Sequence, residues 1–98
     1  MIAAVSDEGV RVDVWLWRAR MFKTRAQASA RAAQGSIRLA RSGALPARID
    51  KPSRMVRVGD ELTFAVGPRL HAVRILALGE RRGPPAEARA LYARLDDS

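Results

Sequence analysis

Cysteine is absent from this sequence of 98 residues, and histidine occurs only once, as His71. The chain therefore has no disulfide, no thiolate ligand for a metal ion and no cysteine nucleophile. His71 lies in a strand-like pattern without a nucleophile or carboxylate at a catalytic spacing, so we expect it to be structural. A phosphate-binding glycine loop is also missing. We predict a protein that is not an enzyme and that holds no cofactor, metal or small-molecule substrate.

A sustained apolar run is missing from the first ten residues, MIAAVSDEGV. This segment resembles neither a secretory signal nor a membrane span. We therefore expect a cytoplasmic protein with no membrane contact, in which residues 1–9 form a flexible leader. The length suits one domain, which we assign to residues 10–79, followed by a basic breaker and a short helix over residues 80–98.

Acidic residues are scarce relative to basic ones. The chain has 10 Asp and Glu against 18 Lys and Arg, a formal net charge of +8 and a pI near 11.5. Such an excess predicts a polyanionic partner. Only Lys23 and Lys51 are lysines, and arginine suits phosphate oxygens, guanine edges and base stacking. A GC-rich genome would also enrich arginine, so this preference alone does not identify the partner.

A first helix is predicted from apolar residues that recur at spacings of three and four. They are Val12, Trp15, Leu16, Ala19 and Phe22. Tryptophan in such a segment usually belongs to the core rather than to a base-stacking surface. We favour the core for Trp15 and leave both alternatives open for Trp17.

A second helix of about ten residues should begin after Thr24 and end before Gly35. Thr24 and Gln27 have the spacing of a capping box, in which each side chain bonds the other residue's amide. We expect a stripe of small residues to pack this helix closely against the first one. The stripe consists of Ala26, Ala30 and Ala33.

The middle of the chain predicts a small, mostly antiparallel sheet, because the apolar period changes to two after Gly35. We expect a strand at Ile37–Leu39, a long loop over residues 41–50, a hairpin that pairs residues 55–58 with 62–66, and a strand within residues 70–78. Residues 86–98 predict a short C-terminal helix. The fold class is therefore α+β.

Four motifs, in this order, carry a family resemblance: RVDVWL at 11–16, KTRAQA at 23–28, QGSIRL at 34–39 and KPSRMVRVGDEL at 51–62. They resemble the RNA-binding domain named after small-subunit ribosomal protein S-four. The Trp-Leu-Trp, Lys-Thr-Arg, Lys-Pro-Ser and later Arg-Arg-x-Pro elements look most like the heat-shock protein fifteen family. The loop at residues 41–50 departs from the Asn-Gly turn that this family commonly has there.

The resemblance implies the alpha-L motif, in which two short helices pack on a small sheet. It also implies binding to ribosomal RNA of the large subunit and a role in the rescue or recycling of stalled large subunits. We also expect a monomer. The residues carried over as RNA-facing are Arg11, Lys23, Thr24, Arg25, Gln27, Arg31, Arg38, Lys51, Ser53 and Arg54.

Some of these residues also have a structural interpretation. Arg25 could pair with Asp13 across the helix crossing, and we expect Asp13 to support the site by holding this arginine. Thr24 could serve only as a cap, although an exposed helix start also attracts phosphate. Two other functions compete: an accessory module like those of pseudouridine synthases and transfer-RNA synthetases, or a general nucleic-acid-binding basic protein.

Overall fold

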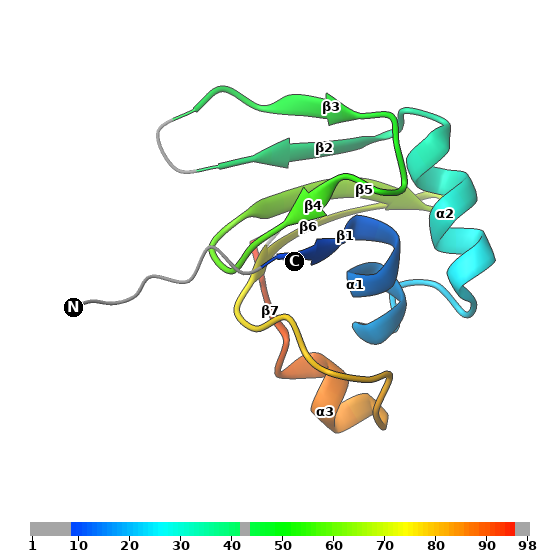
Figure 1. Cartoon of the computed structure of the whole chain (residues 1–98), viewed down its shortest axis with the longest axis vertical. Coiled ribbons are helices and arrows are strands. Elements are labelled where there is room, and N and C mark those ends of the chain that lie inside the picture. The colour runs from blue at the N-terminus through cyan, green and yellow to red at the C-terminus, as the bar shows by residue number, and fades with distance from the viewer. Residues whose placement is uncertain (1–8, 42–43, 96–98) are drawn as a thin grey trace.

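The computed structural model describes residues 9–41 and 44–95. In this part of the chain, three helices accompany one sheet of two strands and one of five (Figure 1). The elements in order are β1 (Val10–Arg11), α1 (Val12–Arg18), α2 (Arg25–Ala33), β2 (Ile37–Ala40), β3 (Ala47–Ile49), β4 (Met55–Val56), β5 (Glu61–Val66), β6 (Arg69–Ile75), α3 (Pro85–Arg89) and β7 (Tyr92–Arg94). This arrangement confirms the predicted α+β class.

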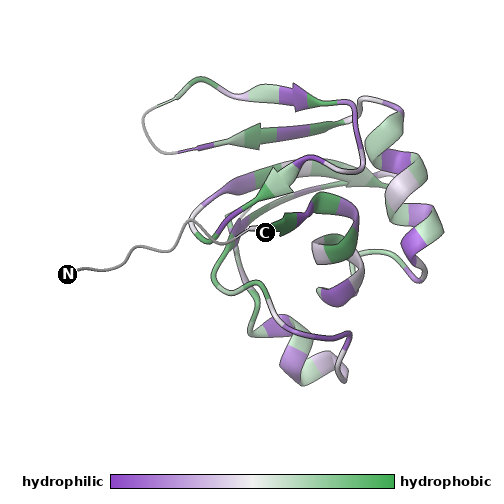
Figure 2. Ribbon diagram, in the orientation of Figure 1, coloured by the Kyte–Doolittle hydropathy of each residue, from purple (hydrophilic) through white to green (hydrophobic). Residues whose placement is uncertain are grey.

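The five-stranded sheet has the order β3-β2-β5-β6-β7, and all of its neighbours are antiparallel. Alternate side chains point to one face, where they are buried in the same core as α1. Figure 2 shows the matching alternation of hydropathy along the strands. The buried residues on this inner face are Ile37, Leu39, Ile49, Leu62, Phe64, Val73 and Ile75.

The predicted hairpin between residues 55–58 and 62–66 is wrong. β4 pairs with β1, through Val10 opposite Val56 and Arg11 opposite Met55. The turn at Gly59–Asp60 does form, but it leads β5 between β2 and β6. Val56 is fully buried in the core, so β4 lies where its apolar side chain is covered rather than where chain proximity alone would put it.

The predicted start of α2 is confirmed in its main feature. Thr24 Oγ1 accepts a hydrogen bond of 3.0 Å from the Gln27 amide. The Gln27 side chain returns to the amide of Lys23, at 3.1 Å, rather than to that of Thr24. Gly35, just beyond the helix, has a φ of 76°, a conformation that glycine adopts without a Cβ clash.

The stripe of small residues predicted to pack α2 against α1 is wrong, because a different face of the helix is buried. Ala28 and Ala32 are fully buried, whereas Ala26, Ala30 and Ala33 are exposed. Both sets have helical spacing, so periodicity alone could not separate them in so alanine-rich a helix. Ala28 and Ala32 are therefore the small residues through which α2 packs into the core.

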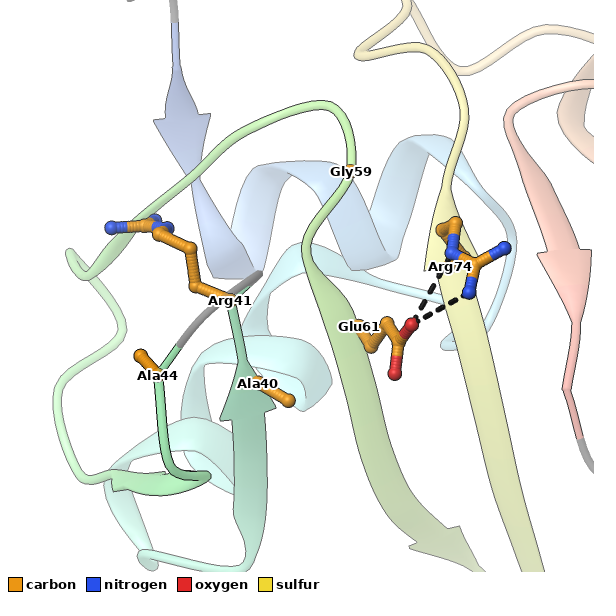
Figure 3. Close-up of a pocket in the computed structure, with 6 residues that line it drawn as sticks. All are labelled: Ala40, Arg41, Ala44, Gly59, Glu61 and Arg74. Atoms are coloured by element: carbon orange, nitrogen blue, oxygen red, sulfur yellow. Dashed lines mark hydrogen bonds and ion pairs between the residues drawn. The ribbon is translucent and has the colours of Figure 1, made fainter.

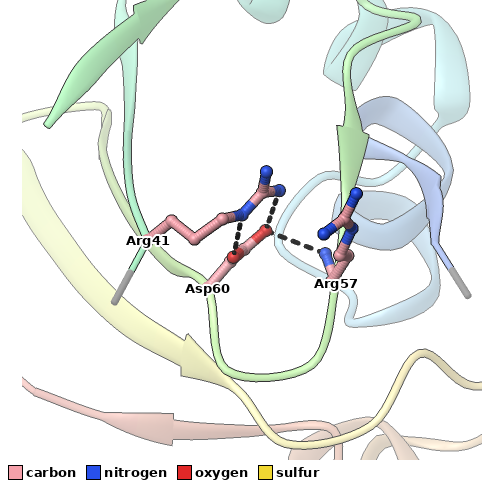
Figure 4. A network of polar contacts seen from close by, with 3 residues as sticks. All are labelled: Arg41, Arg57 and Asp60. Atoms are coloured by element: carbon pink, nitrogen blue, oxygen red, sulfur yellow. Dashed lines mark hydrogen bonds and ion pairs between the residues drawn. The ribbon is translucent and has the colours of Figure 1, made fainter. Parts of the chain in front are cut away.

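The segment predicted as a long loop over residues 41–50 contains a strand. Ala47, Arg48 and Ile49 pair with Leu39, Arg38 and Ile37. Arg41, at the other end, donates 2.9 and 2.8 Å hydrogen bonds to buried Asp60, which also accepts from the Arg57 amide (Figure 4). The hydrogen bond to Asp60 raises the pKa of Arg41. Ser42 and Gly43 lie outside the described residues.

The C-terminal helix is shorter than predicted. α3 ends at Arg89, and Tyr92 to Arg94 instead form β7 at the sheet edge, paired with β6. Trp15 explains this position: it is fully buried, as predicted, its Nε1 donates to the Ala77 carbonyl at 2.9 Å, and its ring meets Tyr92 edge-on. Partial burial of Tyr92 against Trp15 outweighs the helical periodicity of the tail.

The proposed boundaries at residues 9 and 79 stay predictions, and residues 1–8 and 96–98 lie outside the described part. Among the residues that are described, no helix is long and apolar enough to cross a lipid bilayer.

Candidate nucleic-acid interface

The first part of the candidate surface is built where α1 begins on the turn at residues 51–54. The Val12 amide donates to the Arg54 carbonyl at 2.8 Å, and the Asp13 amide donates to the Pro52 carbonyl at 3.4 Å. These bonds satisfy amides that a helix start would otherwise leave free. They also bring Lys51, Ser53 and Arg54 next to Arg11, and all four side chains are exposed.

Asp13 supports this group through Arg11 and not through Arg25. Its buried carboxylate accepts from Arg11 Nε at 3.1 Å and Nη2 at 3.0 Å. The predicted pairing with Arg25 is wrong. Because α1 begins at Val12, Asp13 lies in its first turn, close enough for the Arg11 side chain to reach the carboxylate. The Arg11 side chain stays 46% exposed, so it is oriented by Asp13 and still faces solvent.

The second part is the start of α2, beside α1 in Figure 1. Lys23, Thr24, Arg25 and Gln27 are all exposed there. The first amides of a helix carry partial positive charge, which favours an anion at this end. The capping box occupies the Lys23 and Gln27 amides, so the positive side chains of Lys23 and Arg25 are what this end offers most directly to a phosphate.

Four predicted cations have no hydrogen-bond or ion-pair partner for their side chains among the described residues. They are Lys23, Arg25, Lys51 and Arg54, which lie in the two groups above. No salt bridge within the described residues therefore neutralises these four positive charges. We call these four residues together with Arg11 the helix-side basic group.

Arg31 differs from them because it has internal partners. Its Nη1 donates to the Ala65 carbonyl, and its guanidinium lies 5.8 Å from the centre of the Phe22 ring. On a helix with 3.6 residues per turn, Arg31 and Gln27 lie on the other side of the buried stripe from Arg25. They line a shallow groove of about 340 Å³ together with Gln34 and Val66. The structure thus gives Arg31 a packing role.

Arg38 is separated from the helix-side basic group by the sheet. Its neighbours Ile37 and Leu39 point into the core, so Arg38 points outward on the face away from α1. Its cross-strand partners are Arg48 and Thr63. The ten predicted RNA-facing residues therefore do not form one continuous set.

Several other arginines hold the chain together, and no sequence signal revealed this. Arg18 donates to the Gly79 carbonyl at 2.7 Å and Arg20 donates to the Gly83 carbonyl at 2.7 Å. Arg82 donates to the Trp17 carbonyl, and its guanidinium faces the Trp17 ring at 6.0 Å. These contacts fasten the segment after β6 to the end of α1.

Arg81 forms an ion pair with Glu87, in which Nη2 lies 2.8 Å from Oε1. The hydrogen bond from Arg81 lowers the pKa of Glu87. Both side chains are largely exposed, so this pair contributes little to stability.

A hollow of about 350 Å³ lies beside the end of β2 and the start of β5 (Figure 3). Its one carboxylate, Glu61, accepts hydrogen bonds of 3.2 and 2.8 Å from Arg74. No group of three potential metal-ligating side chains occurs within residues 9–41 and 44–95. The hollow therefore contains a compensated ion pair and no evident acid–base pair.

No family model matches the sequence, but individual relatives do. A heat shock protein 15 homolog of Haemophilus influenzae is 33% identical over 94 residues, which are 96% of this chain and 67% of that protein. The chain belongs to the heat shock protein 15 family. Heat shock protein 15 of Escherichia coli strain K12 is 35% identical over 89 residues, 91% of this chain and 62% of that protein.

A solved structure agrees with the family assignment. The trimeric structure of Vibrio cholerae heat shock protein 15 matches with a TM-score of 0.76 and 31% identity, over 91% of this chain and 84% of that one. The resemblance seen in the four motifs is thus confirmed, and so is the fold it implied. The chain spans about two thirds of the length of the curated heat shock protein 15 relatives.

Proposed function

We propose that this chain binds structured RNA through the helix-side basic group, without catalysing a reaction. The observation that carries the proposal is that Lys23, Arg25, Lys51 and Arg54 have no internal partner among the described residues. Elsewhere in the same protein Arg41, Arg74 and Arg81 are paired with carboxylates. A phosphate backbone supplies the negative charge that the first four side chains lack.

The layout of the group supports RNA over an isolated anion. Arg11 is held by Asp13 on one side, while Lys23 and Arg25 stand at a separate helix start. Cations spread over two elements match successive phosphates better than one small anion. Thr24 and Ser53 add exposed hydroxyls that can donate to phosphate oxygens.

Family membership supports the identity of the RNA. The S-four-type resemblance implies ribosomal RNA, so we propose the large ribosomal subunit as the partner and the rescue or recycling of stalled large subunits as the role. We further propose that the protein acts in the cytoplasm and binds as a monomer. The related Vibrio cholerae structure is described as trimeric. The mass of the protein–RNA complex therefore tests whether this chain binds as a monomer.

A competition at matched salt tests the proposed specificity. The labelled protein is offered a folded fragment of large-subunit RNA and a DNA duplex of equal length, from 0.05 to 0.5 M salt. We expect the RNA to win at every salt concentration, because its fold sets the positions of the phosphates. We also expect log affinity for RNA to fall with log salt by about 0.7 to 0.9 per phosphate contact. Equal binding of both competitors would instead indicate a general nucleic-acid-binding protein.

A further inference from the structure

Two arginines stand directly opposite each other on the outer face of the five-stranded sheet. Arg38 in β2 and Arg48 in β3 are register partners, and both are exposed. Directly opposed side chains of an antiparallel pair have Cβ atoms about 5 Å apart, and like charges in this position destabilise the sheet. The pair therefore needs a compensating charge or has a use that outweighs its cost.

No carboxylate of the described residues compensates this pair. Glu61, the acidic residue that follows in the next row of the sheet, is engaged by Arg74. Asp50, two residues beyond Arg48, forms no ion pair with either arginine. The adjacent row of the same face is thus balanced, while the row with Arg38 and Arg48 carries two uncompensated positive charges.

The surroundings place the Arg48 side chain over the link between α2 and β2. A Cβ on Gly35 would lie 3.5 Å from Arg48 Cδ and Nε, so the stem passes close to this turn. One structural explanation is that Arg48 caps the end of α2. Three of the last four carbonyls of α2 already have partners, however: Ala30 and Arg31 accept from the Gln34 amide, and Ala32 accepts from the Gly35 amide. The Arg48 side chain forms no hydrogen bond with the fourth, that of Ala33. Arg48 is therefore not required as a cap.

We infer that Arg38 and Arg48 together bind a phosphate group of the RNA backbone, on the face of the sheet away from the helix-side basic group. Two guanidinium groups on adjacent strands can hold one phosphate between them, and a bound phosphate removes their mutual repulsion. Thr63, the partner of Arg38 on β5, provides a hydroxyl beside the site. This inference rests on the proposed RNA binding, and it assigns Arg48, which the family motifs do not include.

Two sites on opposite faces of a small domain require an RNA that reaches both. A folded RNA with two backbone segments satisfies this requirement, whereas a short straight duplex reaches one face at a time. The inference therefore requires the bound RNA to contact both faces of the sheet at β2.

Four single variants on the full chain test the inference with the folded large-subunit RNA fragment. Arg48→Gln should weaken binding about 5- to 8-fold at 0.1 M salt and lower the salt slope by about 0.7 to 0.9. Arg48→Lys, which keeps the charge, should retain the slope. Arg89→Gln, in α3, removes an exposed arginine that also lacks a partner among the described residues, and it should change neither quantity. Arg25→Gln reports on the helix-side basic group.

The free protein gives an independent readout, because loss of the repulsion should raise the melting temperature of Arg48→Gln by about 2 to 4 °C at low salt. A merely structural arginine would lower it. If Arg48→Gln binds like Arg89→Gln while Arg25→Gln binds weakly, the inference is overturned and the proposed function stands. If the wild-type chain does not bind the RNA, the proposed function itself fails.

Discussion

Simultaneous replacement of Lys23, Arg25 and Arg54 by glutamine should weaken binding to the folded large-subunit RNA about 100- to 500-fold at 0.1 M salt. The estimate follows from counterion release, since each neutralised phosphate contributes about 0.7 to 0.9 log units at this salt concentration. The three side chains are exposed and have no partner among the described residues, so their removal should leave the fold intact. Binding is measured by fluorescence anisotropy, and folding by circular dichroism.

The chain offers a control with the same loss of charge. Arg57, Arg69 and Arg89 are exposed, and no described residue forms an ion pair or hydrogen bond with their side chains. Their triple replacement by glutamine lowers the net charge equally but leaves the helix-side basic group untouched. We expect at most a few-fold weaker binding. If both triple variants lose the same affinity, net charge alone drives binding and the group has no special role.

Trp15→Ala should have the largest effect on stability, a loss of about 3 to 5 kcal/mol in the free energy of unfolding. The indole is fully buried, packs edge-on against Tyr92 and donates to the Ala77 carbonyl. Truncation leaves a cavity between α1 and the C-terminal strand and removes the partner of that carbonyl. Since small domains have a total stability of about 5 to 15 kcal/mol, the variant should unfold at low urea concentration.

Trp17→Ala is the matched control, because it removes the same type of side chain from the same helix, two residues further along. Trp17 is half-buried, and its ring faces the guanidinium of Arg82. We expect it to lose about 1 to 2 kcal/mol, according to its smaller burial. Urea denaturation followed by circular dichroism compares the two variants. Equal losses would contradict the assignment of Trp15 as the residue that joins α1 to β7.

The sequence predicts those elements that depend on neighbours in the chain. The cap formed by Thr24, the glycine at position 35 and the alternation in β2 and β5 are local signals, and the structure contains all three. The partner of β4 and the strand at Tyr92 depend on which apolar surface remains to be covered. Only the assembled core decides that, so the predicted hairpin was wrong and the predicted C-terminal helix is shorter than expected.

The candidate site shows the same division. Its residue types follow from the motifs, but their grouping depends on pairing across the chain. Asp13 lies two residues from Arg11, and only the start of α1 shows that the two side chains meet. Arg38 and Arg48 become neighbours through the register of β2 and β3, although β3 lies in a segment where the loss of periodicity predicted a loop. Binding at these residues is a prediction that mutagenesis has to test.

The most direct test of the central claim is cross-linking of the protein to RNA in cells, followed by sequencing of the attached RNA. We predict that the cross-linked fragments come from one or a few regions of large-subunit ribosomal RNA. The triple variant of Lys23, Arg25 and Arg54 should lose these fragments, while the triple variant of Arg57, Arg69 and Arg89 keeps them. Fragments scattered over messenger RNA, with no enrichment in the large subunit, would contradict the account.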